Sequence, residues 1–201
     1  MSMTIKNISD YLEKIAPLNQ AEDFDNVGLL IGNETTEVKG VLVTLDTLEE
    51  TIDEAIKKNC NLIISFHPII FSGLKKINGN SYVERVVLKA IQNNIAIYAT
   101  HTALDNSKIG VSAKMCEVLG LTNYSILLPK EDSTIGMGMI GDLPKPMLED
   151  DFLTFTKKTF KTKSNDSGEW IYKIKTPKAG ETHKISIGTN TELIYITNVL
   201  M

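Results

Sequence analysis

Short apolar runs alternate with amphipathic segments between residues 40 and 101, and this alternation limits the possible folds more than any other feature of the chain. The runs at 40–46, 61–67 and 95–101 are rich in Val and Ile, and amphipathic stretches at 47–59 and 81–94 separate them. Buried parallel strands have this continuous apolar character, and the stretches between them have the length of helices. The pattern predicts an α/β fold, with a mostly parallel or mixed sheet built from βαβ units and flanking helices.

Further elements are predicted on both sides of this core. They are a helix at 5–17 that ends at a proline, a strand at 26–32, a helix at 111–121, a short strand at 124–129 and a helix at 148–160. The segment 136–146, GMGMIGDLPKP, contains too many Gly and Pro residues to form a regular element throughout.

The length of 201 residues and the apolar content of 42% fit one globular domain with a smaller appendage. We predict an α/β domain at 1–163 and a strand-rich tail at 164–201. The sequence ends inside the apolar run ELIYITNVLM, so we expect the natural protein to continue beyond it. No apolar run is long enough to span a membrane, and the N-terminal residues are too charged for a signal peptide, which predicts a cytoplasmic protein.

Charge and motif content argue against several functional classes. The net charge of −4 and the isoelectric point near 5.4 provide no general attraction for nucleic acid. Cys60 and Cys116 have no CxxC spacing and are expected to be reduced packing residues. The chain also contains no phosphate-binding loop or dinucleotide fingerprint in a suitable context.

Polar residues close the three strongest predicted strands. Asp46, His67 and His101 are their last residues, and Asp105 follows His101 by four positions. Ligands bind outside the carboxyl ends of the strands in open α/β sheets, so these side chains are expected to share one edge. Imidazole and carboxylate ligands suit zinc, manganese or iron, and pairs of such metals are common in hydrolases.

Each of these residues also has a simpler interpretation that the sequence alone leaves open. His67 could bond a backbone carbonyl at a strand end, and His101 could orient a ligand without binding a metal itself. Asp46 could cap the helix expected from residue 47, and Asp105 could cap the segment that follows it.

Five segments of this sequence together resemble the GTP cyclohydrolase 1 type 2 homologue family, also called the Ngg1-interacting-factor-like family. They cover roughly residues 1–160 in the family's order. The matching segments are AEDFDNVGLLIG at 21–32, VLVTLD at 41–46, LIISFHPIIFSGLKKI at 62–77, IAIYATHTALDN at 95–106 and GMGMIGDLPKPM at 136–147.

The resemblance implies an α/β fold that assembles as a toroidal homohexamer, with up to two divalent metals (zinc, iron or manganese) per chain. His67 matches the second histidine of a His-His-Pro metal motif, and Asp105 matches a metal-binding aspartate. His101 matches a histidine expected beside the metals. Asp25 and Asn26 match an Asp-Asn pair expected to line or support the site.

Two departures from the family pattern lower the metal occupancy expected for the chain as it stands. Phe66 occupies the place of the first histidine of the motif. The histidine and glutamate that the family carries near its C-terminus have no counterpart after residue 163. If the sequence is complete, we expect weak metal binding or none; if residues are missing from it, we expect an intact site.

The leading functional hypothesis is a dinuclear-metal-dependent hydrolase of a small substrate, for which a nucleotide is one candidate. His101 would transfer a proton, while Asp25, Asn26 and Asp46 would support cofactor binding. The alternative is a non-catalytic, ring-shaped scaffold or binding protein with a structural or vestigial metal site. Partners are expected to be other copies of the chain and a small molecule, with neither a membrane nor nucleic acid.

Overall fold

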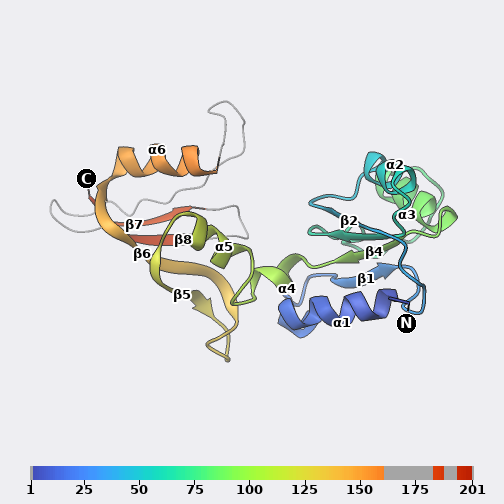
Figure 1. The fold of residues 1–201 in the computed structure, drawn as a ribbon, viewed down its shortest axis with the longest axis horizontal. Coiled ribbons are helices and arrows are strands. Elements are labelled where there is room, and N and C mark those ends of the chain that lie inside the picture. The colour runs from blue at the N-terminus through green and yellow to red at the C-terminus, as the bar shows by residue number, and fades with distance from the viewer. Residues whose placement is uncertain (1, 161–182, 188–193, 201) are drawn as a thin grey trace. The chain divides into compact units, whose positions relative to one another are not determined.

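The computed structural model describes residues 2–160, 183–187 and 194–200 (Figure 1). The chain divides into two compact units, residues 1–104 and residues 105–201. The domain boundary predicted between residues 163 and 164 lies outside the described residues.

The first unit contains a four-stranded sheet in the order β1-β4-β3-β2. Strands β2, β3 and β4 run parallel, and β1 pairs antiparallel with β4. This mixed, mostly parallel sheet built from βαβ units confirms the predicted fold class. The elements of this sheet and its crossovers are β1 (Gly28–Ile31), β2 (Val41–Thr44), α2 (Glu49–Lys57), β3 (Leu62–Ser65), α3 (Tyr82–Gln92) and β4 (Ala96–Ala99).

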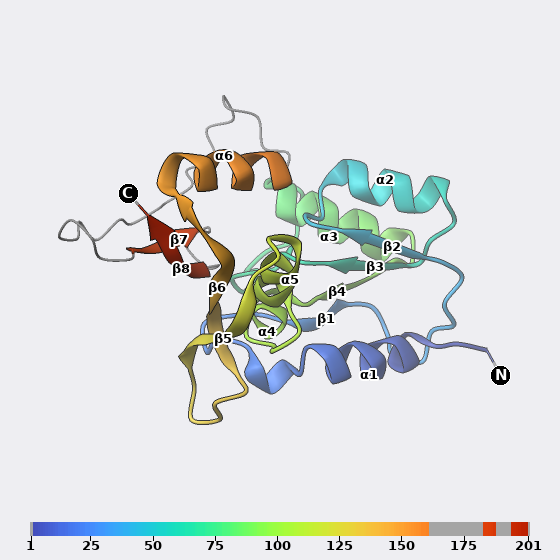
Figure 2. The same ribbon diagram turned by 60° about the vertical axis from the view of Figure 1, so that its left-hand side comes forward.

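The helices of the first unit cover the two faces of this sheet unequally, as Figures 1 and 2 show. Helices α2 and α3 pack on one face, where Ile52, Val86 and Ile97 are completely buried. The short 3-10 turn η1 (Leu18–Gln20) follows α1 (Ile5–Ile15), which packs on the other face through Ile5 against Tyr98. One face therefore carries two helices and the other only one.

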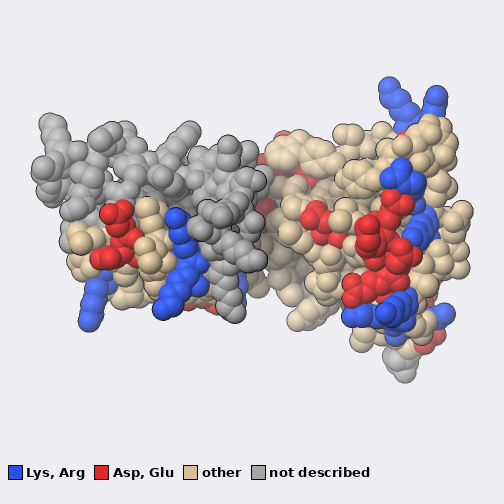
Figure 3. All heavy atoms as spheres, turned by 90° about the horizontal axis from the view of Figure 1, so that it is seen from above, with Lys and Arg blue, Asp and Glu red and all other residues tan. Residues whose placement is uncertain are grey.

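Ion pairs join the two helices that share a face. Arg85 in α3 contacts Glu49 at 2.9 Å, and Lys89 in α3 contacts Asp53 at 2.7 Å. Figure 3, which looks down on this face, shows the acidic side chains as a band with basic side chains beside it. The face therefore presents no continuous basic surface.

The second unit contains another four-stranded sheet, in the order β5-β6-β8-β7. Helices α5 and α6 pack against it around Cys116, Met139 and the fully buried Phe152. Two of its strands, β7 and β8, lie in the part of the chain predicted to be a strand-rich tail. The elements from residue 101 onward are α4 (His101–Asp105), α5 (Val111–Val118), β5 (Thr122–Pro129), β6 (Gly136–Leu148), α6 (Glu149–Thr159), β7 (His183–Ile187) and β8 (Ile194–Leu200).

Strand β6 corrects one prediction, because it runs through the Gly- and Pro-rich segment 136–146 that was expected to be irregular. Gly136 allows close pairing with β5, since a Cβ there would lie only 2.2 Å from the carbonyl oxygen of Leu128. The register with β8 shifts between Asp142 and Met147, where the prolines lie. Prolines are tolerated where a β-ladder is interrupted, so the segment remains extended.

Within the described part of the chain, no helix is both long and apolar enough to cross a membrane.

Candidate functional site

The predicted site residues Asp46, His67 and His101 lie at one edge of the first sheet. Each follows the carboxyl end of its strand by two residues, because β2, β3 and β4 end slightly earlier than predicted. Backbone hydrogen bonds continue past these ends. The amide of His67 donates to the carbonyl of Leu45 at 3.0 Å, and the amide of His101 donates to the carbonyl of Phe66 at 3.0 Å. These bonds bring the two imidazole rings together, with centroids 5.5 Å apart.

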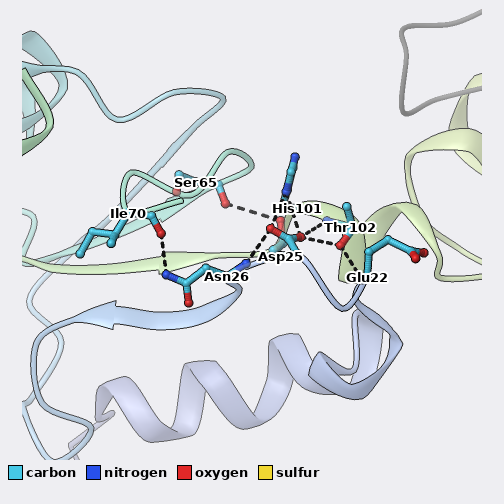
Figure 4. Close-up of polar contacts among 8 residues, drawn as sticks. Glu22, Asp25, Asn26, Ser65, Ile70, His101 and Thr102 are labelled. Carbon is cyan, nitrogen blue, oxygen red and sulfur yellow. Dashed lines mark hydrogen bonds and ion pairs between the residues drawn. The ribbon is translucent and has the colours of Figure 1, made fainter. Parts of the chain in front are cut away.

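His101 forms a buried pair with Asp25 (Figure 4). Nδ1 of His101 lies 2.8 and 2.9 Å from the two carboxylate oxygens of Asp25, whose side chain is 0% exposed, against 12% for the histidine. The same carboxylate accepts hydrogen bonds from the backbone amides of Asn26 at 2.8 Å and Thr102 at 3.1 Å, and from the Thr102 hydroxyl. Asp25 thus fixes the orientation of the ring and leaves Nε2 on its far side.

Hydrogen bonding keeps the Asp25 carboxylate ionised despite its burial. Burial alone would raise its pKa, because it disfavours the charged form. The hydrogen bonds from Thr102, His101 and the backbone amide of Asn26 outweigh that effect, and the pKa of Asp25 is lowered. A carboxylate that stays ionised near neutral pH accepts a hydrogen bond from Nδ1–H of His101 and so favours that tautomer of the ring.

The backbone of His101 is itself constrained, with a φ angle of +26°. A non-glycine residue in the left-handed region costs free energy and persists only where its surroundings enforce it. The bonds to Phe66 and Asp25 enforce it here, at the first residue of α4. The chain therefore holds this imidazole in place at some cost in stability, which is typical of functional positions.

His67 forms a second carboxylate pair of the same type, with Nδ1 2.7 Å from Oδ1 of Asp46. This pair is half-exposed, with side-chain exposures of 46% for His67 and 54% for Asp46. The hydroxyls of Thr44 and Thr51 donate to the backbone carbonyl of Asp46 and hold its loop. Asp46 does not cap the next helix through its side chain, because the N-cap of α2 is Leu48, whose backbone amide donates to the hydroxyl of Thr51 at 3.2 Å.

Asn26 supports the site from below. Its backbone amide donates to Asp25, and its side-chain amide donates to the carbonyl of Ile70 (Figure 4). These bonds tie the loop before β1 to the segment that follows His67. Asn26 therefore positions the neighbouring groups through these two bonds.

Aromatic rings surround the two imidazoles. Phe66 lies edge-on to both, with centroid distances of 5.0 Å to His67 and 5.5 Å to His101. Phe71 lies 6.4 Å from His101, and Phe24 lies 6.4 Å from Phe71. Sequence reasoning did not assign a role to the last two, although both are large apolar side chains that remain more than half exposed.

Thr102 is a further site residue that sequence reasoning missed. It is fully buried, and its hydroxyl accepts a hydrogen bond from the amide of Glu22 at 3.0 Å while it donates to Asp25. The only signal in the sequence was its position next to His101.

The side chains of the first unit provide some of the features of a divalent-metal site. In metal sites, a ligating histidine usually donates its other ring nitrogen to a carboxylate, and both His67 and His101 have this arrangement. The described residues nevertheless contain no cluster of three or more His, Cys, Asp or Glu side chains suited to a metal. Asp105, the remaining predicted ligand, is buried and is the first residue of the second unit. The first unit therefore fits part of a metal site, with two oriented imidazoles.

A family model described as Duf34/NIF3 (NGG1p interacting factor 3) matches residues 3–176. The chain belongs to this family. Similar curated relatives include a "GTP cyclohydrolase 1 type 2 homolog" from Clostridium acetobutylicum, 36% identical over 166 residues, which cover 82% of this chain. Another of the same name, from Staphylococcus epidermidis, is 38% identical over 148 residues, or 74% of this chain.

Solved structures agree with this family assignment. A hypothetical protein from Staphylococcus aureus matches with a TM-score of 0.75 at 31% identity, over 80% of this chain and 65% of that one. Reduced HcgD from Methanocaldococcus jannaschii matches with a TM-score of 0.67 at 28% identity, over 79% and 60% of the two chains. This Duf34/NIF3 chain spans 62% and 40% of the lengths of the two curated relatives.

Proposed function

We propose that this Duf34/NIF3 protein is a metal-dependent hydrolase of a small substrate, with its reaction centre beside His67 and His101. The observation that carries the proposal is the pair of neighbouring imidazoles, each bonded through Nδ1 to its own carboxylate. Both rings therefore offer Nε2 at the carboxyl ends of the strands, where α/β proteins place their ligands. The curated relatives named after GTP cyclohydrolase support a hydrolytic reaction and make a nucleotide a candidate substrate.

His67 and Asp105 are the residues proposed to hold a divalent metal, as in the family pattern. Zinc, iron or manganese bound there would lower the pKa of a water molecule and supply a nucleophile near neutral pH. Asp46 bonds Nδ1 of His67 and so would leave Nε2 of that ring available as the ligand atom.

The buried pair is proposed to move the proton of the reaction. When water attacks the scissile centre, its oxygen forms the new bond and one of its protons passes to Nε2 of His101. The leaving group departs with the bonding electron pair and receives that proton. Asp25 stabilises the protonated ring in between, because its carboxylate stays charged and lies against Nδ1.

Three alanine substitutions of histidine test the proposal. The full-length protein would be loaded with zinc, manganese or ferrous iron, and its metal content and its hydrolysis of GTP, 4-nitrophenyl phosphate and 4-nitrophenyl acetate would be measured. We expect His67→Ala to lose metal and activity together. His101→Ala should keep its metal and lose about 100- to 10,000-fold in turnover. His183→Ala, the third histidine of the chain, is the matched control and should change neither quantity.

A protein that takes up no metal and hydrolyses none of these compounds would contradict the proposal. Equal turnover in the His101→Ala and wild-type proteins would leave metal binding possible but remove the proton transfer assigned to His101.

A non-catalytic scaffold is the alternative, and two observations favour it. Phe66 stands where the family pattern has a histidine, and the described residues hold no three-ligand cluster. In that case the chain would assemble as a toroidal homohexamer without turnover, with a mass in solution six times 22.3 kDa. Sedimentation of the metal-free and metal-loaded protein would separate the two functions, since a scaffold keeps its hexamer without metal or activity.

The proposal extends to the location and the partners of the protein. We place the protein in the cytoplasm, with a small molecule and other copies of itself as partners. Nucleic acid is left out because the net charge is −4 and the face over α2 and α3 carries an acidic band (Figure 3).

A further inference from the structure

An apolar groove of about 250 Å³ lies on the face of the first sheet that carries only one helix. Leu12 and Ile15 of α1 and Val43 of β2 are among the residues that line it. Val43 is 74% exposed and pairs in register with the half-buried Ile64 of β3. A second helix on this face would cover these residues, and within the first unit none does.

The groove continues to the histidine pair through a shared residue. Phe66 lines the groove, and its ring also lies 5.0 and 5.5 Å from the rings of His67 and His101. A molecule lying in the groove would therefore have one end beside the imidazoles.

The polar groups of the groove are already used by the protein. The hydroxyls of Thr44, Ser65 and Thr100 donate to the backbone carbonyls of Asp46, Tyr98 and Ser65 respectively. The lining therefore offers these donors to its own backbone, whereas a nucleobase would need free donors to read its polar edge. A hydrocarbon needs none, and its burial is favourable in proportion to its area.

We propose that this groove binds the acyl or alkyl chain of the substrate, with the scissile group beside His101. The inference rests on the proposed function and narrows its substrate to molecules that carry an apolar chain. The groove selects for chain length, and Phe66 separates the chain from the imidazoles.

The test uses the full chain and two compound series of increasing length. Straight-chain carboxylates from acetate to octanoate would be titrated against protein with labelled Val and Ile methyl groups, and the 4-nitrophenyl esters of the same acids would be assayed for hydrolysis. We expect saturable shifts at the Val43 and Ile64 methyls, with affinity rising about fourfold per methylene until the groove is filled. The kcat/KM of the esters should rise in parallel.

Val43→Trp and Val41→Trp make a matched pair of variants. Both residues lie on the exposed edge strand β2 and their side chains share one face, but only Val43 lines the groove. Val43→Trp should fill the groove and abolish the dependence on chain length, while Val41→Trp should retain it. Chain-length dependence that survives Val43→Trp, or no shift at the two methyls, overturns the inference.

Two other outcomes separate this inference from the proposed function. If no ester is hydrolysed but the carboxylates still bind with chain-length dependence, the groove is supported and the hydrolase proposal fails. If short and long esters are hydrolysed equally well, the groove inference fails and the hydrolase proposal stands. A change in the sedimented mass of Val43→Trp, with the ester series unaltered, would make the groove an interface between copies and overturn the inference.

Discussion

The two histidine–carboxylate pairs have the same hydrogen bond and very different surroundings. Asp25 and His101 have side chains that are 0% and 12% exposed, whereas Asp46 and His67 are 54% and 46% exposed. The Asp25 carboxylate accepts three more hydrogen bonds besides that of the histidine. The buried pair is thus part of the packed structure, while the exposed pair rests on a single contact between two side chains.

This difference in exposure indicates that the two pairs have different roles. A buried, multiply bonded carboxylate holds a ring in one orientation and keeps its own charge, which suits a group that must exchange a proton with a fixed partner. A half-exposed pair adjusts more easily and is accessible to an incoming ligand. The comparison also predicts that removing the carboxylate of Asp25 lowers stability much more than removing that of Asp46.

The largest effect on stability is expected for Asp25→Asn. The amide cannot accept all of the hydrogen bonds that the carboxylate accepts, so buried donors of Thr102 and His101 would be left unsatisfied. Each such loss costs about 1–3 kcal/mol, and we expect a total decrease of about 3 kcal/mol in the free energy of unfolding. Urea titration at pH 7 measures it. A decrease below 1 kcal/mol would show that the two pairs are energetically alike.

The decrease in the free energy of unfolding at acid pH should depend on the same residue, Asp25. The pKa of Asp25 is lowered in the folded protein relative to its ordinary value of 3.8. Its contribution is therefore fully present above that ordinary value and is lost as the pH falls through the folded pKa. Urea titrations between pH 7 and pH 2.5 should show wild-type stability approaching that of Asp25→Asn as the pH falls. A constant gap between the two proteins would contradict the assignment.

The sequence predicted the arrangement of the first unit well, because parallel strands and their crossover helices have strong local signatures. It also placed Asp46, His67 and His101 at one edge, since the strands that carry them run parallel. The separation into a buried and an exposed pair could not be predicted, because it depends on how the loop containing Asp25 packs against α4. Strand β6 was missed for a related reason: its glycines and prolines are permitted by pairing partners that the local sequence does not specify.

A smaller effect is expected from restoring the family's missing histidine with Phe66→His. An additional imidazole beside His67 should tighten zinc binding about tenfold, or about 1.4 kcal/mol, measured by calorimetric titration of the metal-free protein. Phe71→His is the matched control, because Phe71 also contacts His101 but lies outside the three positions of the His-His-Pro motif. Equal tightening in the two variants would show that any added imidazole suffices and that position 66 has no special role.

The smallest effect is expected for Asp46→Asn, which removes the charge of the exposed carboxylate. Exposed ion pairs contribute little to stability, so the free energy of unfolding should fall by less than about 1 kcal/mol. The ring of His67 should nevertheless lose its fixed tautomer, because an amide can either accept from or donate to Nδ1. Long-range nitrogen–proton NMR spectra would show mixed Nδ1–H and Nε2–H signals for His67 and an unchanged Nδ1–H form for His101. A drop in stability as large as that of Asp25→Asn would mean that exposure does not distinguish the two pairs. The different roles inferred from their exposure would then be wrong.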